Sequence, residues 1–157
     1  MVSRAIRAPE RNSRMTTPAE VKPIVVGFDG SDHSTGALQQ ARTLAEALHL
    51  PLVVLVAWRY SVLSGEGELV LNLWGALDDS RRAAEDAVTA AYGGAPPDTV
   101  SIELVDGSPT RELIRASDRA EMVVVGSRGL GGFQELLLGS VSAAVAEHAR
   151  SPVLVVH

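Results

Sequence analysis

The chain has 157 residues, of which 46% are hydrophobic and 21% charged, and its formal net charge is −5. This length suits one domain, and the absence of cysteine excludes disulfides, thiol catalysis and thiolate metal sites and fits a reducing cytoplasm, where we expect the protein. An acidic chain with no apolar run near the ~20 residues of a membrane span predicts neither nucleic acid nor a membrane as partner.

The amino-terminal stretch differs in charge from the remainder. Its first fourteen residues contain four arginines and one glutamate, a net charge of +3, so the other residues together carry −8. We expect residues 1–20 to be a disordered basic extension that precedes one domain over 21–157. A basic arm that contacts nucleic acid or membrane is the alternative for this extension, and either Met1 or Met15 is compatible with the natural start.

The first three elements follow from clear patterns. An apolar run that begins at Ile24 and ends in glycines and an aspartate predicts a strand buried on both faces, followed by a turn. Apolar residues at helical spacing predict a helix over 34–49, which Ser31 or Asp32 can cap. The next apolar run predicts a strand over 52–58.

The middle of the chain is less regular. Residues 59–76 contain three glycines and show no clear period, so we expect a long loop, with at most a turn of helix around 69–74. A face of small residues, most of them alanine, then predicts a helix over 77–92.

The last third returns to alternating strands and helices. Alternation of apolar and polar residues predicts an edge or near-edge strand over 99–105, and Ser108 places a capping hydroxyl before a proline at the start of a helix over 109–119. The remaining elements are a strand over 121–127, a helix over 139–149 and a final strand over 152–156.

This order of elements predicts an α/β fold with an open, five-stranded parallel sheet and helices on both faces. Right-handed crossovers favour the strand order 3-2-1-4-5. The order reverses between the first and fourth strands, and ligands of such sheets bind at that point, outside the carboxyl ends of the strands. Two glycine-containing stretches are expected there, at 27–31 and 126–132.

Three glycines, two in the later stretch and one that follows it, point to a bound anion. Gly126 ends the fourth strand, where the lack of a side chain lets a ligand approach the backbone, and Gly129 keeps the following loop open. Gly139 precedes the last helix, whose first amides lack internal partners and, with the helix dipole, attract anions.

Side chains near these glycines add to the anion site. Ser140 and Ser142 supply hydroxyls, and Arg128 supplies a guanidinium that suits a phosphate. The alternative is a mobile surface loop with Ser140 as an ordinary helix cap. The position between strand and helix at the crevice favours phosphate. A P-loop is excluded because no lysine follows Lys22, and no dinucleotide fingerprint follows the first strand.

The spacing Gly126-x2-Gly129-x9-Gly139-Ser140 resembles the nucleotide-binding signature of the universal stress protein family. The likeness covers nearly all of 22–157 and includes the stretches IVVGFDGSDHS, DGSPTRELIRAS and the closing unit that begins MVVVGSRGLGG. It implies the family's sheet, of the adenine nucleotide alpha hydrolase-like type, and the family's ATP-binding branch. It also implies a homodimer formed through the final strand, 152–156.

The resemblance implies roles for individual residues. Asp29 faces the nucleoside, with Gly27 just before that turn, and Ala57 and Val125 border the adenine. The family often has proline or alanine in place of Gly27 and valine in place of Ala57, which leaves the base preference open. The ribose and phosphates are held by Gly126, Gly129, Gly139, Ser140 and Val141, with help from Ser142.

Residue types alone leave other roles open. Asp29 can bind Mg²⁺ or a nucleoside donor, or it can fix the turn through its own side chain, and its place at the crevice favours a ligand. Ser140 has no evident general base nearby, so we expect no catalytic residue. The four histidines show no metal spacing, and His33 and His49, which flank the first helix, are expected to be solvated.

We therefore expect a nucleotide-dependent stress or signalling module that binds ATP, with or without Mg²⁺, and hydrolyses it slowly or not at all. The alternatives are a dimeric protein-interaction module without a ligand, a variant that binds cyclic AMP, and an enzyme on the same fold, such as a nucleotidyl transferase or a phosphate hydrolase.

Overall fold

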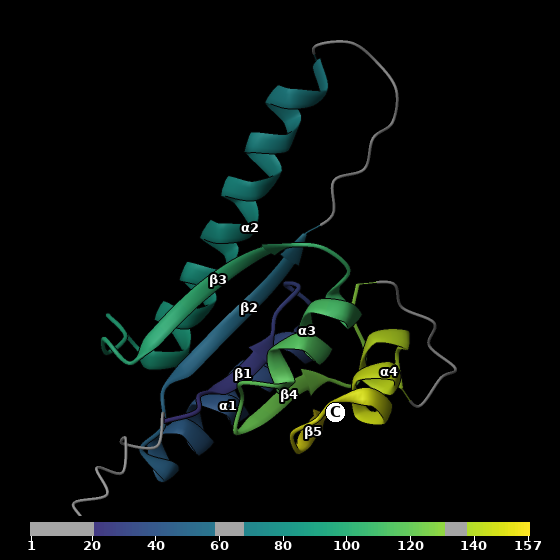
Figure 1. The fold of residues 1–157 in the computed structure, drawn as a ribbon. Coiled ribbons are helices and arrows are strands. Elements are labelled where there is room, and N and C mark those ends of the chain that lie inside the picture. Colours follow the sequence, from purple (N-terminus) through teal and green to yellow (C-terminus); the bar gives the residue numbers. More distant parts are fainter. Residues whose placement is uncertain (1–20, 59–67, 131–137) are drawn as a thin grey trace, which may run out of the picture.

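The computed structural model describes residues 21–58, 68–130 and 138–157, which form five strands and four helices in alternation (Figure 1). All strand pairs are parallel, and the order across the sheet is β3-β2-β1-β4-β5, as the sequence predicts. The elements are β1 (Ile24–Gly27), α1 (Asp32–Leu48), β2 (Leu52–Trp58), α2 (Glu68–Tyr92), β3 (Val100–Asp106), α3 (Pro109–Ser117), β4 (Met122–Gly126), α4 (Ser140–His148) and β5 (Val153–Val156).

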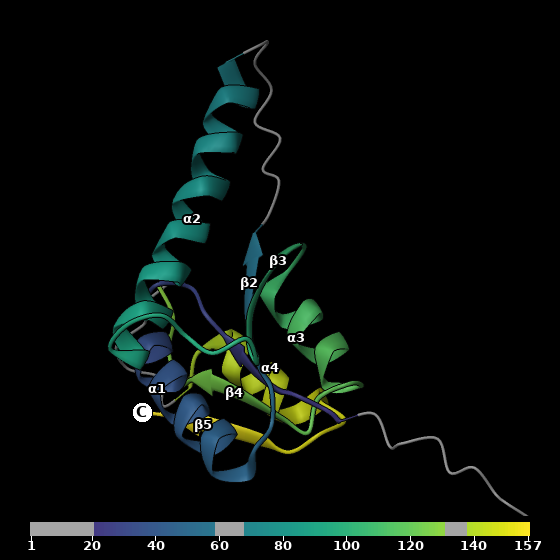
Figure 2. The ribbon, with the colours of Figure 1, turned by 90° about the vertical axis from the view of Figure 1, so that its left-hand side faces the viewer.

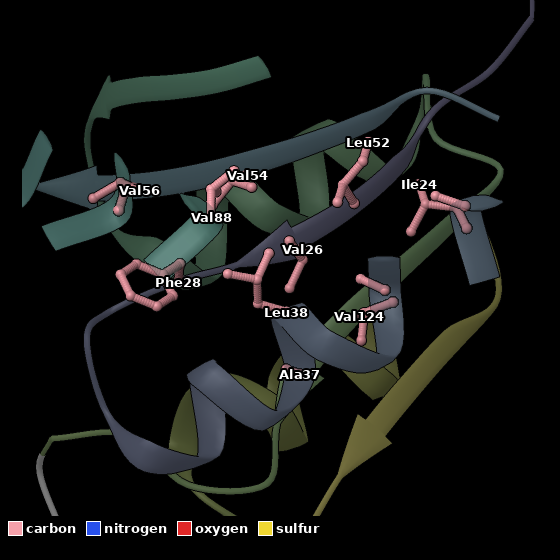
Figure 3. Close-up of a cluster of buried hydrophobic side chains, with 13 residues drawn as sticks. Ile24, Val26, Phe28, Ala37, Leu38, Leu52, Val54, Val56, Val88 and Val124 are labelled. Carbon is pink, nitrogen blue, oxygen red and sulfur yellow. The ribbon is translucent and has the colours of Figure 1, made fainter. Parts of the chain in front are cut away.

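Helices cover both faces of the sheet, α1 and α2 on one and α3 and α4 on the other (Figure 2). Successive residues of a strand point to opposite faces, so the central strands feed two separate cores. In β1, Val26 joins the core under α1 and α2, whereas Val25 joins the core under α3 and α4. Figure 3 shows the first core, where Leu38 of α1 and Val88 of α2 meet side chains from the strands.

The ends of α1 follow local capping. Ser31 is the N-cap, and its side chain accepts a hydrogen bond from the Ser34 amide, so the helix begins at Asp32, before the predicted residue 34. His49 lies outside the helix in the left-handed conformation, with φ of 55°. In α3, Ser108 is the N-cap residue but makes no capping hydrogen bond through its side chain, so the predicted capping hydroxyl is wrong.

Helix α2 is the main departure from the sequence prediction. It begins at Glu68, so the loop predicted over 59–76 is wrong for 68–76, while 59–67 lies outside the described residues. The carboxyl-terminal half packs on the sheet through the buried Ala84 and Val88. The amino-terminal part extends past the strands (Figures 1 and 2).

The sheet has two edges. Strand β3 forms one of them, which confirms the predicted edge position, and only partial burial is found along it. Strand β5 forms the other edge.

Within the described ranges, no helix is both long enough and apolar enough to cross a bilayer. The predicted disordered extension, 1–20, lies outside those ranges.

Candidate functional site

A cavity of about 590 Å³ opens at the carboxyl ends of the central strands. Its wall comes from the β1–α1 turn, the ends of β2 and β4, the starts of α3 and α4, and the loop after β4. The volume falls in the range of small-molecule sites, and the position is the switch point that parallel sheets of this type use for ligands.

The structure brings all the predicted site residues to this one cavity. They come from four separate parts of the chain, which the strand order places side by side. Whether each contacts a ligand stays a prediction. The set comprises Gly27, Asp29, Ala57, Val125, Gly126, Arg128, Gly129, Gly139, Ser140, Val141 and Ser142.

Among the residues that the structure describes, six more line the cavity and were missed from the sequence. Pro109 could have been found, because it begins the helix after β3 and must therefore lie at the same end of the sheet. The others enter through packing that one sequence does not reveal. The six are Phe28, Ser34, Leu55, Pro109, Leu113 and Leu130.

One part of the cavity is apolar. Leu55, Ala57 and Val125 line it from the sheet, and Leu113 lies over the end of β1 from α3. A Cβ atom at Gly27 would lie 3.0 Å from Cδ1 of Leu113, so the glycine makes room for this leucine. The result is a hydrophobic surface suited to a flat, apolar ring.

The start of α4 forms a more polar part of the wall. Gly139 is the N-cap and has no side chain that could occupy the helix start, so the first turn of α4 stays open to a ligand. The Gly139 amide itself donates to the Ser127 carbonyl at 2.7 Å, so the amides available to an anion are those that follow it. A helix of this length has the dipole that favours negative charge there.

Ser142 has a structural contact in addition to its predicted role. Its side chain is buried. The hydroxyl donates to two carbonyls, that of Ser127 at 2.9 Å and that of Gly139 at 3.0 Å. This hydroxyl therefore ties the first turn of α4 to the end of β4. Ser140, in contrast, is exposed at the helix start.

Asp29 is exposed at the cavity, yet its carboxylate accepts hydrogen bonds on both oxygens. Oδ1 accepts from the amide and hydroxyl of Ser31 at 3.0 and 2.6 Å, and Oδ2 accepts from the Leu130 amide at 3.2 Å. Partial burial raises the pKa of Asp29, but the hydrogen bonds from Ser31, Ser34 and Leu130 outweigh it, and the pKa lies below its ordinary value. The group is ionised at neutral pH.

Close packing explains why residue 126 is glycine, and the sequence did not reveal this. A Cβ atom there would lie 2.7 Å from the His33 carbonyl carbon and 2.8 Å from its Cβ atom, so the glycine lets α1 approach β4. The expectation that His33 is solvated is wrong, because it is half-buried with Nδ1 3.4 Å from the Ser127 hydroxyl. His49 is exposed, as expected.

The charged side chains around the cavity nearly cancel. Among the described residues that line it, Arg128 and Asp29 carry opposite charges and the others are neutral. In the part of the chain that the structure describes, no three His, Cys, Asp or Glu side chains gather as a metal site would need. Mg²⁺ often takes most of its ligands from phosphates and water, so such an ion would fit here only together with a phosphate ligand.

Comparison with known proteins identifies relatives along nearly the whole chain. The model of the universal stress protein family matches residues 20–157. Universal stress protein Rv2623 of Mycobacterium tuberculosis is 33% identical over 152 residues, which cover 93% of this chain and 48% of that protein. Universal stress protein Rv2005c of the same species is 34% identical over 148 residues, 91% of this chain and 50% of that protein. The chain thus spans about half the length of the curated relatives it matches.

Solved structures agree with this assignment. The universal stress protein UspA from Lactobacillus plantarum has a TM-score of 0.71 at 23% identity, covering 88% of this chain and 99% of its own, which shows the shared fold. A universal stress protein solved in complex with cAMP has a TM-score of 0.58 at 28% identity and covers 88% of this chain and 99% of its own. Taken with the family match over residues 20–157, these likenesses show that the chain belongs to the universal stress protein family.

Proposed function

We propose that this chain binds an adenine nucleotide, with ATP as the first candidate. It would act as a nucleotide-dependent stress or signalling module with slow or no hydrolysis. One observation carries the proposal: residues from four parts of the chain line a single cavity that joins an apolar wall to the glycine-capped start of α4. An adenine ring and a phosphate chain need these two surfaces at opposite ends of one site.

The cavity suggests how the ligand would lie. The adenine would pack against Ala57, Val125 and Leu113, where the wall is apolar. The phosphates would meet the amides at the start of α4 and the guanidinium of Arg128. Ser140 is exposed there and would donate its hydroxyl to the same phosphates.

Mg²⁺ would accompany the triphosphate. The side-chain charges of Arg128 and Asp29 cancel, so the described cavity wall offers a polyanion little net positive charge. Mg²⁺ bound to the phosphates would supply the missing charge and take ligands from the phosphates and from water. We therefore expect ATP affinity to fall strongly when EDTA removes divalent cations.

Cyclic AMP is the second candidate. A related universal stress protein was solved in complex with cAMP, and the near-zero side-chain charge of the described cavity wall suits a ligand with a single phosphodiester charge. Its affinity should depend little on divalent cations. This contrast separates the two nucleotides experimentally.

The assembly and location follow from simpler features. Strand β5 is an edge strand of the sheet, so we propose a homodimer paired through 152–156, in the cytoplasm. A dimer that acts through protein contacts without a ligand is the remaining alternative.

The test is to identify the ligand directly. Native mass spectrometry of the full chain, purified without added nucleotide, should show a bound adenine nucleotide. Calorimetric titration with ATP, cAMP and GTP, each with Mg²⁺ and with EDTA, should then show saturable binding of an adenine nucleotide and weaker binding of GTP. No retained nucleotide and no saturable binding would reject the proposal in favour of the ligand-free dimer.

A further inference from the structure

One carboxylate joins the β1–α1 turn to the loop after β4. Oδ2 of Asp29 accepts a hydrogen bond from the Leu130 amide, between residues that lie 101 positions apart in the sequence. The same oxygen fills the space beside Gly129, because a Cβ atom built on Gly129 would lie 2.5 Å from it. Two adjacent residues of the loop are therefore fitted to the Asp29 side chain.

The second oxygen of Asp29 is anchored within its own turn. Oδ1 accepts from both the amide and the hydroxyl of Ser31, which also caps α1. An ionised carboxylate can accept on both oxygens at once, whereas an amide side chain offers only one acceptor oxygen. The lowered pKa of Asp29 agrees with a carboxylate that is ionised and held by donors on both sides.

We propose that Asp29 is a positioning residue, whose carboxylate holds Gly129 and Leu130 against the β1–α1 turn and so shapes the phosphate side of the cavity before a ligand arrives. A loop that is already ordered costs less free energy to bind, because less conformational freedom is lost on binding. The inference rests on the proposed function for the identity of the ligand, but the contact itself belongs to the free protein.

This role differs from the direct nucleoside contact that family resemblance implies for Asp29. A carboxylate that only accepted a hydrogen bond from the nucleoside would, when removed, weaken adenosine and ATP equally. A carboxylate that positions the loop would weaken ATP more than adenosine, because only ATP has phosphates for the loop to hold.

Two variants break the contact in different ways. Asp29→Asn keeps the size of the side chain but cannot serve both Ser31 and Leu130 as an acceptor. Gly129→Ala keeps the carboxylate but places a Cβ atom where Oδ2 lies. Gly36→Ala is the matched control, because there the same change, within α1, meets only Val156 at 3.8 Å.

The experiment measures hydrogen exchange of the Leu130 amide in the free, full-length protein, together with affinities for ATP and adenosine. Exchange should be about five- to tenfold faster in Asp29→Asn and Gly129→Ala, since a hydrogen bond to a charged group is lost at an exposed site, and unchanged in Gly36→Ala. ATP affinity should fall by more than adenosine affinity in both loop variants.

A double variant checks that the two changes act through one contact. If Asp29→Ala removes the side chain, Gly129→Ala should add almost nothing to the exchange rate, because the clash has gone. Unchanged Leu130 exchange in both single variants, or equal losses for ATP and adenosine, would overturn the positioning role. A wild-type chain that binds neither ligand would refute the proposed function alone, while the exchange rates would still decide the role of Asp29.

Discussion

Gly139 is the residue whose substitution tests the proposed nucleotide site most sharply. Its φ of −71° and ψ of 163° are open to any residue, and a Cβ atom there would meet only ordinary contacts, the nearest at 3.4 Å from the Ser127 carbonyl oxygen. The glycine is therefore not needed for the fold at this position. What it provides is a helix start without a side chain.

Replacing Gly139 with aspartate should abolish ATP binding while the protein stays folded. Aspartate is a favoured N-cap, so stability should be equal to wild type or higher by a few tenths of a kcal/mol. Its carboxylate would, however, occupy the helix start and repel the phosphates. Calorimetric titration measures the loss, with Gly139→Ala as the control that adds a Cβ without charge. Wild-type affinity in Gly139→Asp would place the phosphates elsewhere.

Asp29 makes the folding stability depend on pH, in a direction that follows from its lowered pKa. Its folded pKa is lowered, below the unfolded value of about 3.9. The stabilisation it provides is therefore fully present above that unfolded value and is lost as the pH falls through the folded pKa. Urea unfolding of wild type and Asp29→Asn should give the same difference in stability at pH 7 and pH 5, and a smaller one at pH 3. A difference that persists undiminished at pH 3 would contradict this assignment.

Among the elements, the contact between α1 and β4 sets the position of the cavity. Gly126 ends β4 under the backbone of His33, so the two elements approach closely without an intervening side chain. The loop that leads to α4 starts at this point. A shift of α1 here would move the β1–α1 turn relative to that loop.

Gly126→Ala should therefore destabilise the protein by about 1–3 kcal/mol, the usual cost of overpacking a tight contact. Gly36→Ala is its matched partner within α1 and should be neutral or stabilising by up to about 1 kcal/mol, because alanine favours helix. Chemical denaturation of the two variants beside wild type measures both changes. Equal stability of Gly126→Ala and wild type would mean that α1 does not pack as described.

The elements also show what one sequence can reveal. The inner strands were predictable because unbroken apolar runs that begin after proline or end at glycine have few other structures. The first part of α2 was not, because it has a glycine before it and another within it, and its apolar residues follow one another so closely in the sequence that no single apolar face marks a helix.

The same limit applies to the site. Most of the lining residues were predictable because all strands of a parallel sheet end on one side, so a strand order is enough to bring them together. The contacts His33–Gly126 and Asp29–Leu130 were not, because each joins segments far apart in the sequence and depends on how closely they pack rather than on any local pattern.

At the scale of the whole molecule, β5 forms one edge of the five-stranded sheet. The carbonyls of Pro152 and Val156 accept hydrogen bonds from the amides of Val123 and Ser127. In the alternating pattern of a strand, the polar groups of Val153 and Val155 therefore face outward. All four residues of β5 are only half-buried. An edge of this kind can pair with the same edge of a second copy.

Val155→Pro should prevent that pairing. Proline removes the outward N–H of this position and is tolerated where the N–H faces away from the sheet, so β5 should stay paired with β4. Light scattering after size exclusion should give a dimer for wild type and for Val155→Ala and a monomer for Val155→Pro. A dimer that survives in Val155→Pro, or a monomeric wild type, would exclude assembly through β5.

The central claim is that the glycine-capped start of α4 and the apolar wall of the cavity hold the two ends of one adenine nucleotide. A crystal structure of the full chain grown with ATP and Mg²⁺ tests it most directly. We predict the phosphates within hydrogen-bonding distance of the amides of Ser140 and Val141, and the adenine against Ala57 and Val125. Nucleotide bound outside the cavity, or a cavity that stays empty at saturating ATP, would contradict the claim.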